Sequence, residues 1–260
     1  MTIDPYYIQN AGFVTATKAK NFMKCPACFK AIEDGYIPPS TAAMEFGTLM
    51  HEIMEKGVEH FTKHYEILEP RKKTTTYEGF KHPITNSEGQ KIMNILDEMS
   101  RHPIFDIGGE YLKEEALTGK FRDKLPLRSK LDRISVEKGL IRDWKFTADP
   151  EKFKYAILDF NYLFSMAFYW ILAKQKYDKE FRLILDVVGT NKLSCRSIEI
   201  PHEMIAPQIP IVRSTLDSII ECKENDSFLE KARSWGRCTG NNPAYLVCPN
   251  AVINDFETYS

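Results

Sequence analysis

Two aspartates and a lysine near the middle of the chain are the residues best suited to chemistry. Asp143 and Lys145 lie in the segment 140–147 (LIRDWKFT), and Asp132 lies in the segment 127–136 (LRSKLDRISV); both segments have the composition of β-strands. Alternate side chains of a strand point to the same face, so Asp143 and Lys145 should share one face. A Glu-Lys-Gly stretch between the segments predicts a tight turn, and hence an antiparallel hairpin that brings Asp132 alongside Asp143.

This arrangement would create a site for a divalent cation. Two carboxylates held close together repel each other unless a cation lies between them, and hard oxygen ligands suit Mg²⁺ or Mn²⁺. A metal ion there could polarise a phosphoryl oxygen and acidify a bound water, as phosphodiester hydrolysis requires. Lys145 could orient or deprotonate the attacking water, or stabilise developing negative charge. A surface hairpin with an ordinary ion pair is the alternative interpretation of the same residues.

The charge around Asp132 favours a polyanionic substrate. The whole chain carries 35 Lys and Arg against 36 Asp and Glu, a net charge of −1, which argues against a protein that coats DNA regardless of its sequence. The segment 120–133, in contrast, contains six basic and two acidic residues. Positive charge beside paired acids is expected of an enzyme that binds a phosphate backbone; the alternative is a solvated, charged strand.

The elements that must position these residues form a mixed α/β pattern. The 260 residues are 43% hydrophobic and 27% charged, which is typical of a globular protein with a sizeable core. The pattern predicts helices over residues 15–34, 42–64, 86–102 (capped by Asn86 or Ser87), 157–176 and 203–224, and strands over 110–117, 127–136, 140–147, 181–190 and 195–200. This order predicts an α/β fold with a central mixed sheet flanked by helices.

We expect a single domain over residues 1–260. It would comprise a helical N-terminal part (1–105), a core of sheet and helix (106–200), and a C-terminal helix with an irregular tail (201–260). The N-terminus does not have the pattern of a secretory signal, and the longest apolar run, 162–173, is too short to span a bilayer. The expectation is a cytoplasmic protein with no membrane partner.

Several segments, in order along the chain, resemble the PD-(D/E)xK nucleases of the RecB type. They are FGTLMHEIM (46–54), LRSKLDRI (127–134), GLIRDWKFTAD (139–149) and YLFSMAFYW (162–170), and the upstream KCPACFKAI resembles the short Cys-Pro-x-x-Phe element of that family. Within the superfamily the chain is most similar to the nuclease domain of exodeoxyribonuclease VIII (RecE) and its phage relatives. The resemblance implies a restriction-endonuclease-like core.

The resemblance also implies roles for individual residues. Asp132 and Asp143 would be the metal-binding acids. His51, in a Gly-x-x-x-His helix element, would be a metal ligand or lie close to the substrate, and the Trp144 carbonyl would complete the coordination. Lys145 would be the catalytic lysine.

Further residues are assigned to catalysis or DNA binding by the same resemblance. Glu115 would be an additional catalytic acid, although an exposed strand glutamate beside Glu114 explains it equally well. Tyr169 would match the tyrosine of the family's Gln-x-x-x-Tyr motif, which contacts DNA; Ser165 stands in place of the glutamine, on the same helix face, and reaches less far. Basic side chains predicted to contact the DNA backbone or a 5′-phosphate are Arg122, Arg128, Lys130, Lys152 and Lys154.

Cysteines bracket the predicted domain, with Cys25 and Cys28 at one end and Cys238 and Cys248 at the other. Some RecB-like nucleases bind a 4Fe–4S cluster, usually through one N-terminal and three C-terminal cysteines, and this chain does not reproduce that spacing even if Cys222 is included. The two pairs could instead bind Zn²⁺. Buried free thiols are the favoured interpretation.

The combined expectation is a Mg²⁺- or Mn²⁺-dependent DNA exonuclease. We expect it to degrade linear double-stranded DNA from 5′ to 3′ and to resect ends for a single-strand annealing recombinase, in a bacterium or a phage-infected host cell. The resemblance implies a ring-shaped homo-oligomer, a trimer or tetramer. The alternatives are a single-strand nuclease of the CRISPR-adaptation type with a cysteine-bound cluster, a non-catalytic DNA-end-binding protein on the same fold, and an interaction protein with no nucleic-acid role.

Overall fold

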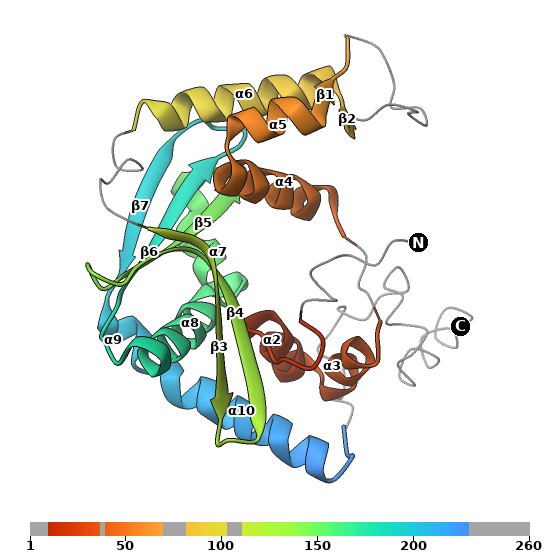
Figure 1. Cartoon of the computed structure of the whole chain (residues 1–260), viewed down its shortest axis with the longest axis vertical. Coiled ribbons are helices and arrows are strands. Elements are labelled where there is room, and N and C mark those ends of the chain that lie inside the picture. The colour runs from red at the N-terminus through yellow and green to blue at the C-terminus, as the bar shows by residue number, and fades with distance from the viewer. Residues whose placement is uncertain (1–9, 37–39, 70–81, 103–110, 229–260) are drawn as a thin grey trace, which may run out of the picture.

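A central sheet organises the protein, of which a computed structural model describes residues 10–36, 40–69, 82–102 and 111–228. Its strands follow the order β3–β4–β5–β6–β7 (Figure 1). They are β3 (Leu112–Phe121), β4 (Leu125–Ser135), β5 (Leu140–Thr147), β6 (Arg182–Gly189) and β7 (Cys195–Ile200). Only β5 and β6 pair in parallel, and the other neighbours are antiparallel. The predicted fold, α/β with a mixed sheet, is confirmed.

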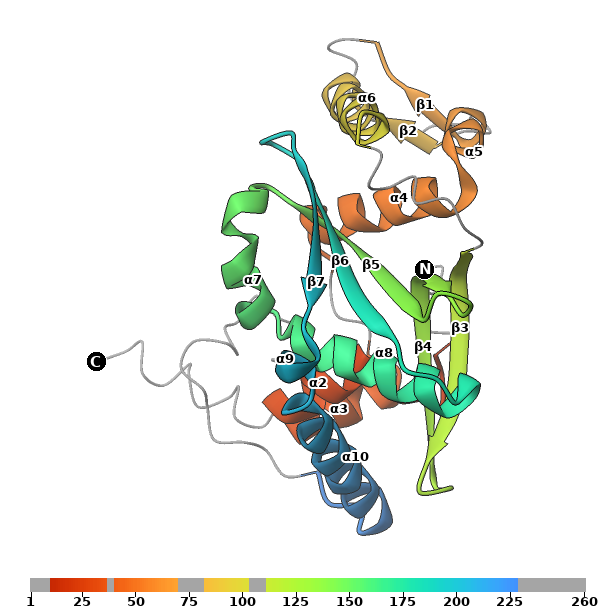
Figure 2. The same ribbon diagram turned by 90° about the vertical axis from the view of Figure 1, so that its left-hand side faces the viewer.

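Helices cover both faces of the sheet and build two hydrophobic cores (Figures 1 and 2). The larger core involves α2 (Ala16–Lys24), α3 (Pro26–Glu33), α7 (Phe153–Asp159), α8 (Tyr162–Tyr177), α9 (His202–Ile205) and α10 (Gln208–Glu224). The smaller core involves α4 (Ala42–Lys56), α5 (Val58–His64), α6 (Asn86–Ser100) and the two-stranded parallel sheet of β1 (Tyr65–Ile67) and β2 (His82–Ile84). Residues of β5 contribute to both cores, with Ile141 in the larger and Trp144 in the smaller.

Two predicted helices are divided where the backbone leaves the helical region. The helix predicted over 15–34 begins after its Thr15 cap as expected, but it splits at Cys25, whose φ is −160°. The next residue is proline, which disfavours a helical conformation in the residue before it. The helix predicted over 42–64 splits at Gly57, where φ is 88° and ψ is 165°, a conformation open essentially to glycine alone.

The remaining helices differ less from the prediction. The helix predicted over 157–176 begins inside α7 and is divided before α8, because Asn161 between the two helices adopts a left-handed conformation (φ 50°). A 3-10 turn, η2 (Pro150–Lys152), precedes α7. The helix α6 is capped by Thr85, immediately before the residues predicted to cap it. The helix predicted over 203–224 is divided between α9 and α10, next to Pro207.

The strand predictions are close to the structure. The hairpin of β4 and β5 is present, with Arg133 opposite Arg142. The strand predicted over 110–117 begins and ends later, as β3. Some of the predicted segments lie outside the described residues. They are residues 70–81, between two of the predicted helices, and the irregular tail from residue 229 onwards.

In the described part of the chain, no single helix is long and apolar enough to cross a membrane. By length and composition alone, one bent pair could do so, Pro150–Asp159 together with Tyr162–Tyr177, whose axes differ by 73°.

Candidate active site

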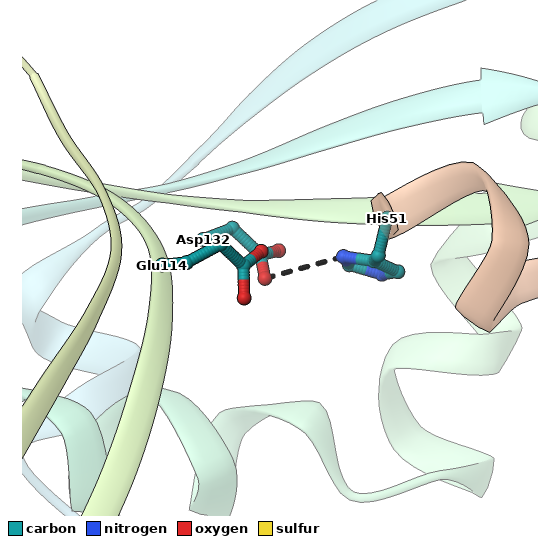
Figure 3. Close-up of side chains that lie close together, drawn as sticks. All are labelled: His51, Glu114 and Asp132. Carbon is teal, nitrogen blue, oxygen red and sulfur yellow. Dashed lines mark ion pairs between the residues drawn. The ribbon is translucent and has the colours of Figure 1, made fainter. Parts of the chain in front are cut away.

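Three side chains from separate elements meet beside the sheet (Figure 3). His51 comes from α4, Glu114 from β3 and Asp132 from β4, and one ligand atom of each lies within 4.8 Å of the others. The Nδ1 atom of His51 is 3.2 Å from Oδ1 of Asp132. An imidazole nitrogen and carboxylate oxygens are a ligand set suited to a divalent cation.

The packing of α4 explains why His51 faces the strands. Thr41 caps this helix, its side chain accepting a hydrogen bond from the Met44 amide. Met50 and Ile53 are buried in the smaller core and therefore fix the rotation of the helix about its axis. The edge of the His51 ring packs against Phe146 of β5, with ring centroids 5.6 Å apart.

Glu114, rather than the predicted Glu115, is the glutamate that joins this group. Glu115 lies 2.7 Å from Nζ of Lys176 in an ion pair, outside the cluster. Glu114 is half-buried, ion-paired with Lys130, and has a left-handed backbone (φ 52°) in the middle of a strand. Adjacent residues of a strand point to opposite faces, so only one of the two glutamates can face the site. The pairing of β3 with β4 places Glu114 level with Asp132 and so determines which one it is. That register cannot be predicted from a single sequence.

Asp143 and Lys145 lie on the next strand and are ion-paired with each other; Asp143 is buried and Lys145 is half-buried. Lys145 also donates a hydrogen bond from Nζ to the Trp144 carbonyl, at 3.0 Å, and its Nζ lies 5.1 Å from the centre of the Tyr162 ring. The Trp144 amide donates to Oδ2 of Asp132 at 2.6 Å. The structure thus brings together five of the six residues predicted to form the metal and catalytic site, all but Glu115, although their roles stay predictions.

Burial and neighbouring charges shift the pKa values of the ionisable residues in the candidate site. Burial alone would raise the pKa of Asp132, but His51 and Lys145 outweigh burial and lower that pKa. Burial raises the pKa of Asp143, with Asp132 adding to the effect. Burial would lower the pKa values of His51 and Lys145, yet the carboxylates raise both. An imidazolium and an ammonium therefore offset the paired acids here, in positions where a metal ion could take over part of that balance.

A second lysine, Lys20 of α2, lies close to the site and was missed in the sequence. Its Nζ is 5.9 Å from the centre of the Tyr162 ring, and burial, with Lys145 adding, lowers the pKa of Lys20 to about 8. Lys20 is far from the other site residues in the chain, and no local pattern distinguishes it from its neighbours Lys18 and Lys24.

Only some of the residues predicted to bind DNA lie together. Tyr169, Arg128 and Lys130 line one cavity of about 130 Å³. Its other lining residues include Thr15 and Thr17 at the N-terminus of α2 and Ser129 of β4. The Ser129 hydroxyl is buried (4% exposed) and has no hydrogen-bond partner among the described residues.

Other predicted contacts lie elsewhere. Arg122 is ion-paired with Asp217, 2.6 Å away, at the far end of the β3–β4 hairpin, and does not join the cavity. Ser165 is buried in α8, among the apolar residues of the larger core. Its burial explains why a small side chain occupies the position of the family's glutamine. Lys152 and Lys154 lie on η2 and α7.

The cysteine prediction is only partly within the described residues. Cys25 is buried between α2 and α3, Cys28 is partly buried in α3, and neither forms a disulfide. Cys238 and Cys248 lie outside the described residues. Among the residues that the structure describes, no cysteine belongs to a group of three or more potential metal ligands. A cluster or zinc site stays an untested prediction.

The mixed sheet, with two acids and a lysine on neighbouring strands and a helix histidine facing them, defines a domain of the PD-(D/E)xK type. A family model described as "PDDEXK-like domain of unknown function (DUF3799)" matches residues 15–239, and the chain belongs to that family. No curated protein matches the sequence.

A solved structure shares this architecture. A presumed exonuclease from Eubacterium rectale superposes with a TM-score of 0.70 at 13% identity, over 92% of each chain. At this identity the likeness concerns the fold. A phage-related exonuclease from Haemophilus somnus is also similar, with a TM-score of 0.37 and 13% identity over 85% of this chain and 99% of that one.

Proposed function

We propose that this protein is a metal-dependent DNA exonuclease. The observation that carries the proposal is the convergence of Asp132 and Asp143 with Lys145, on strands of a PD-(D/E)xK fold, with His51 and Glu114 within reach. Carboxylate oxygens favour Mg²⁺ or Mn²⁺, and the histidine nitrogen is better tolerated by Mn²⁺.

The residues of the site divide into metal ligands and a lysine that faces the reacting water. Asp132, Asp143 and the Trp144 carbonyl would hold the ion, with His51 at its edge. When bound, such an ion polarises the phosphoryl oxygen and acidifies a water molecule. Lys145, held by its ion pair with Asp143, would orient that water and stabilise charge that develops on the phosphate.

The cavity beside the site suits a terminal phosphate. Arg128 and Lys130 supply positive charge, and the N-terminus of α2 directs backbone amides into the same space. The buried hydroxyl of Ser129, three residues before Asp132 on β4, would donate the hydrogen bond it lacks among the described residues. Because a 5′ end commonly carries a phosphate, this cavity supports 5′→3′ polarity. We further propose, from the resemblance to RecE, that the exposed 3′ strand passes to an annealing recombinase and that the enzyme works as a ring-shaped homo-oligomer.

Digestion of linear duplex labelled at either the 5′ or the 3′ end, with Mg²⁺ or with a chelator, tests the activity and its polarity. We expect metal-dependent release of 5′-terminal nucleotides, and a loss of about 10²–10⁴-fold in Lys145→Ala. Lys138→Ala, on the turn at the other end of the same hairpin, is the matched control. Early release of the 3′ label would refute the polarity, and unchanged cleavage by Asp143→Asn would refute the site.

A second experiment tests the phosphate cavity. The rate on 5′-phosphorylated duplex is divided by the rate on 5′-hydroxyl duplex, for the natural protein and for Ser129→Ala. We expect the variant to lose about tenfold or more of this preference without losing stability, since the hydroxyl has no partner among the described residues. Ser135→Ala, another buried serine of β4, should keep the preference. Equal ratios for the natural protein and Ser129→Ala would contradict the assignment.

A further inference from the structure

Three large apolar side chains stand out into solvent on and directly after α7. They are Leu158 (69% exposed), Phe160 (61%) and Tyr155 (60%), and no other large apolar side chain of the described residues is as exposed. The helix buries its opposite side through Phe153 and Ile157 in the larger core. The helix therefore presents apolar surface on both sides, which packing of the domain alone does not require.

This surface adjoins the candidate active site. The Phe160 ring lies 5.8 Å from the Tyr162 ring, and the Tyr162 ring lies 5.1 Å from Nζ of Lys145. Two contacts thus lead from the solvent-exposed phenylalanine to the catalytic lysine. The exposed ring therefore lies within a few nucleotides of the lysine along a DNA strand.

Lysines accompany the exposed rings. Nζ of Lys154 lies 5.0 Å from the centre of the Tyr155 ring, and Lys20 donates a hydrogen bond to the Phe160 carbonyl at 3.2 Å. Asp159 is the exposed acid on the same short helix. Of the two acids before the helix, Glu151 is ion-paired with Lys192 at 2.6 Å, and Asp149 caps η2 by accepting a hydrogen bond from the Glu151 amide. Flat rings alternating with ammonium groups complement bases joined by phosphates better than they complement an apolar protein surface.

We infer that Tyr155, Leu158 and Phe160 form a stacking face for unpaired nucleotides of the DNA strand next to the scissile phosphate. Bases would lie against the rings, and Lys20 and Lys154 would contact the intervening phosphates. The inference rests on the proposed nuclease function, because that function brings a strand past Lys145. It adds a class of ligand, single-stranded DNA a few nucleotides long, to a surface outside the metal site.

The direct test is binding of a fluorescent twelve-residue oligothymidylate to the full chain, in chelator so that no cleavage occurs. Phe160→Ala should bind about 5- to 150-fold more weakly, the loss expected for one stacked base. Phe160→Tyr should restore binding, because it restores a flat ring. Ile211→Ala, at another exposed apolar residue (42%) on α10, is the control and should bind like the natural protein.

A second measurement reports stacking without depending on an affinity. The chain contains three tryptophans, so Phe160→Trp adds one emitter to a known background. We expect the oligothymidylate to quench the added emission and to leave the emission of the natural protein nearly unchanged.

The outcomes separate this inference from the proposed function. Unchanged affinity in Phe160→Ala, or a new tryptophan that is not quenched, overturns the stacking face whether or not the protein cleaves DNA. A change in oligomeric state of Phe160→Ala in sedimentation, with unchanged affinity, overturns it in favour of a contact between copies. Intact stacking together with no metal-dependent cleavage of any duplex would overturn the proposed nuclease function alone.

Discussion

The replacement Asp186→Asn should destabilise the protein more than any comparable change of a surface acid. Asp186 is fully buried and accepts hydrogen bonds from Arg133 (2.5 Å), from Arg142 (2.7 and 2.5 Å) and from Ser197 (2.5 Å). The side chains of the two arginines are 9% and 1% exposed. The guanidinium of Arg133 in turn lies 4.2 Å from the centre of the ring of Trp144, a residue of the candidate site.

The size of the effect follows from the charges that remain. Asparagine keeps the volume of Asp186 but leaves two buried guanidinium groups with no carboxylate between them. Removing one partner of a buried ion pair typically costs about 3–5 kcal/mol. For a chain of this length, that corresponds to a fall of about 6–20 °C in Tm. The loss of stability comes from positive charge that is buried without a carboxylate. Because asparagine keeps the volume of aspartate, a cavity contributes little to it.

Urea denaturation followed by circular dichroism measures the change in the free energy of unfolding. Glu199→Gln is the matched control, because Glu199 on β7 makes a similar two-bonded ion pair with Arg182 (2.8 and 2.6 Å) in solvent. Exposed pairs contribute about 0–1 kcal/mol. If Asp186→Asn lost no more stability than Glu199→Gln, the reasoning that the buried carboxylate holds the two arginines together would be wrong.

Three further predictions concern the helices around the site. The raised pKa of His51 means that its proton competes with a metal ion, so the affinity for Mn²⁺ should fall as the pH drops through that pKa. Calorimetry in two buffers should show protons released in that range of pH, and equal heats would contradict this. Gly57→Ala should lower the free energy of unfolding, measured in urea, by about 1–3 kcal/mol because of the backbone conformation of Gly57 (φ 88°, ψ 165°). Gly47→Ala, within α4 and with open space around it, should raise that free energy by up to about 1 kcal/mol. The reverse order would refute the backbone argument. Burial would raise the pKa of Glu52, but hydrogen-bond donors led by Lys56 lower it to about 2. The stability that this carboxylate contributes above pH 4.5 should therefore be lost as the pH falls from 4.5 towards 2. In Glu52→Gln, the free energy of unfolding should depend less steeply on pH over this range.

The sequence predicted the fold wherever a local pattern determined it. The β4–β5 hairpin and the strongly apolar β6 follow from strand periodicity and turn chemistry, and they appear within a few residues of their expected bounds. Helix breaks were missed at Cys25 and Gly57, although proline and glycine marked both places. Helical periodicity in the flanking residues outweighed these signals, since it continues across each break.

For the candidate site, the residues that could not be predicted from the sequence are those brought there by contacts between distant segments of the chain. Asp132, Asp143 and Lys145 could be predicted because a hairpin relates them through a turn of four residues. Glu114 could not, because its proximity to Asp132 depends on the register between β3 and β4. Lys20 could not either, since it reaches the site only through the packing of α2 against the larger core.

The position of the site follows from the way β5 changes partners. It pairs with β4 over only three residues, Leu140 to Arg142, and with β6 along its whole length. Beyond Arg142 the two strands separate (Figure 2), and backbone groups of β5 that face β4 need other partners. Asp132 takes the Trp144 amide and Lys145 takes the Trp144 carbonyl. Because the strands diverge, the amide and carbonyl of Trp144 bond to side chains of the candidate site, while burial of alternate residues of β5 in opposite cores fixes the position of the strand.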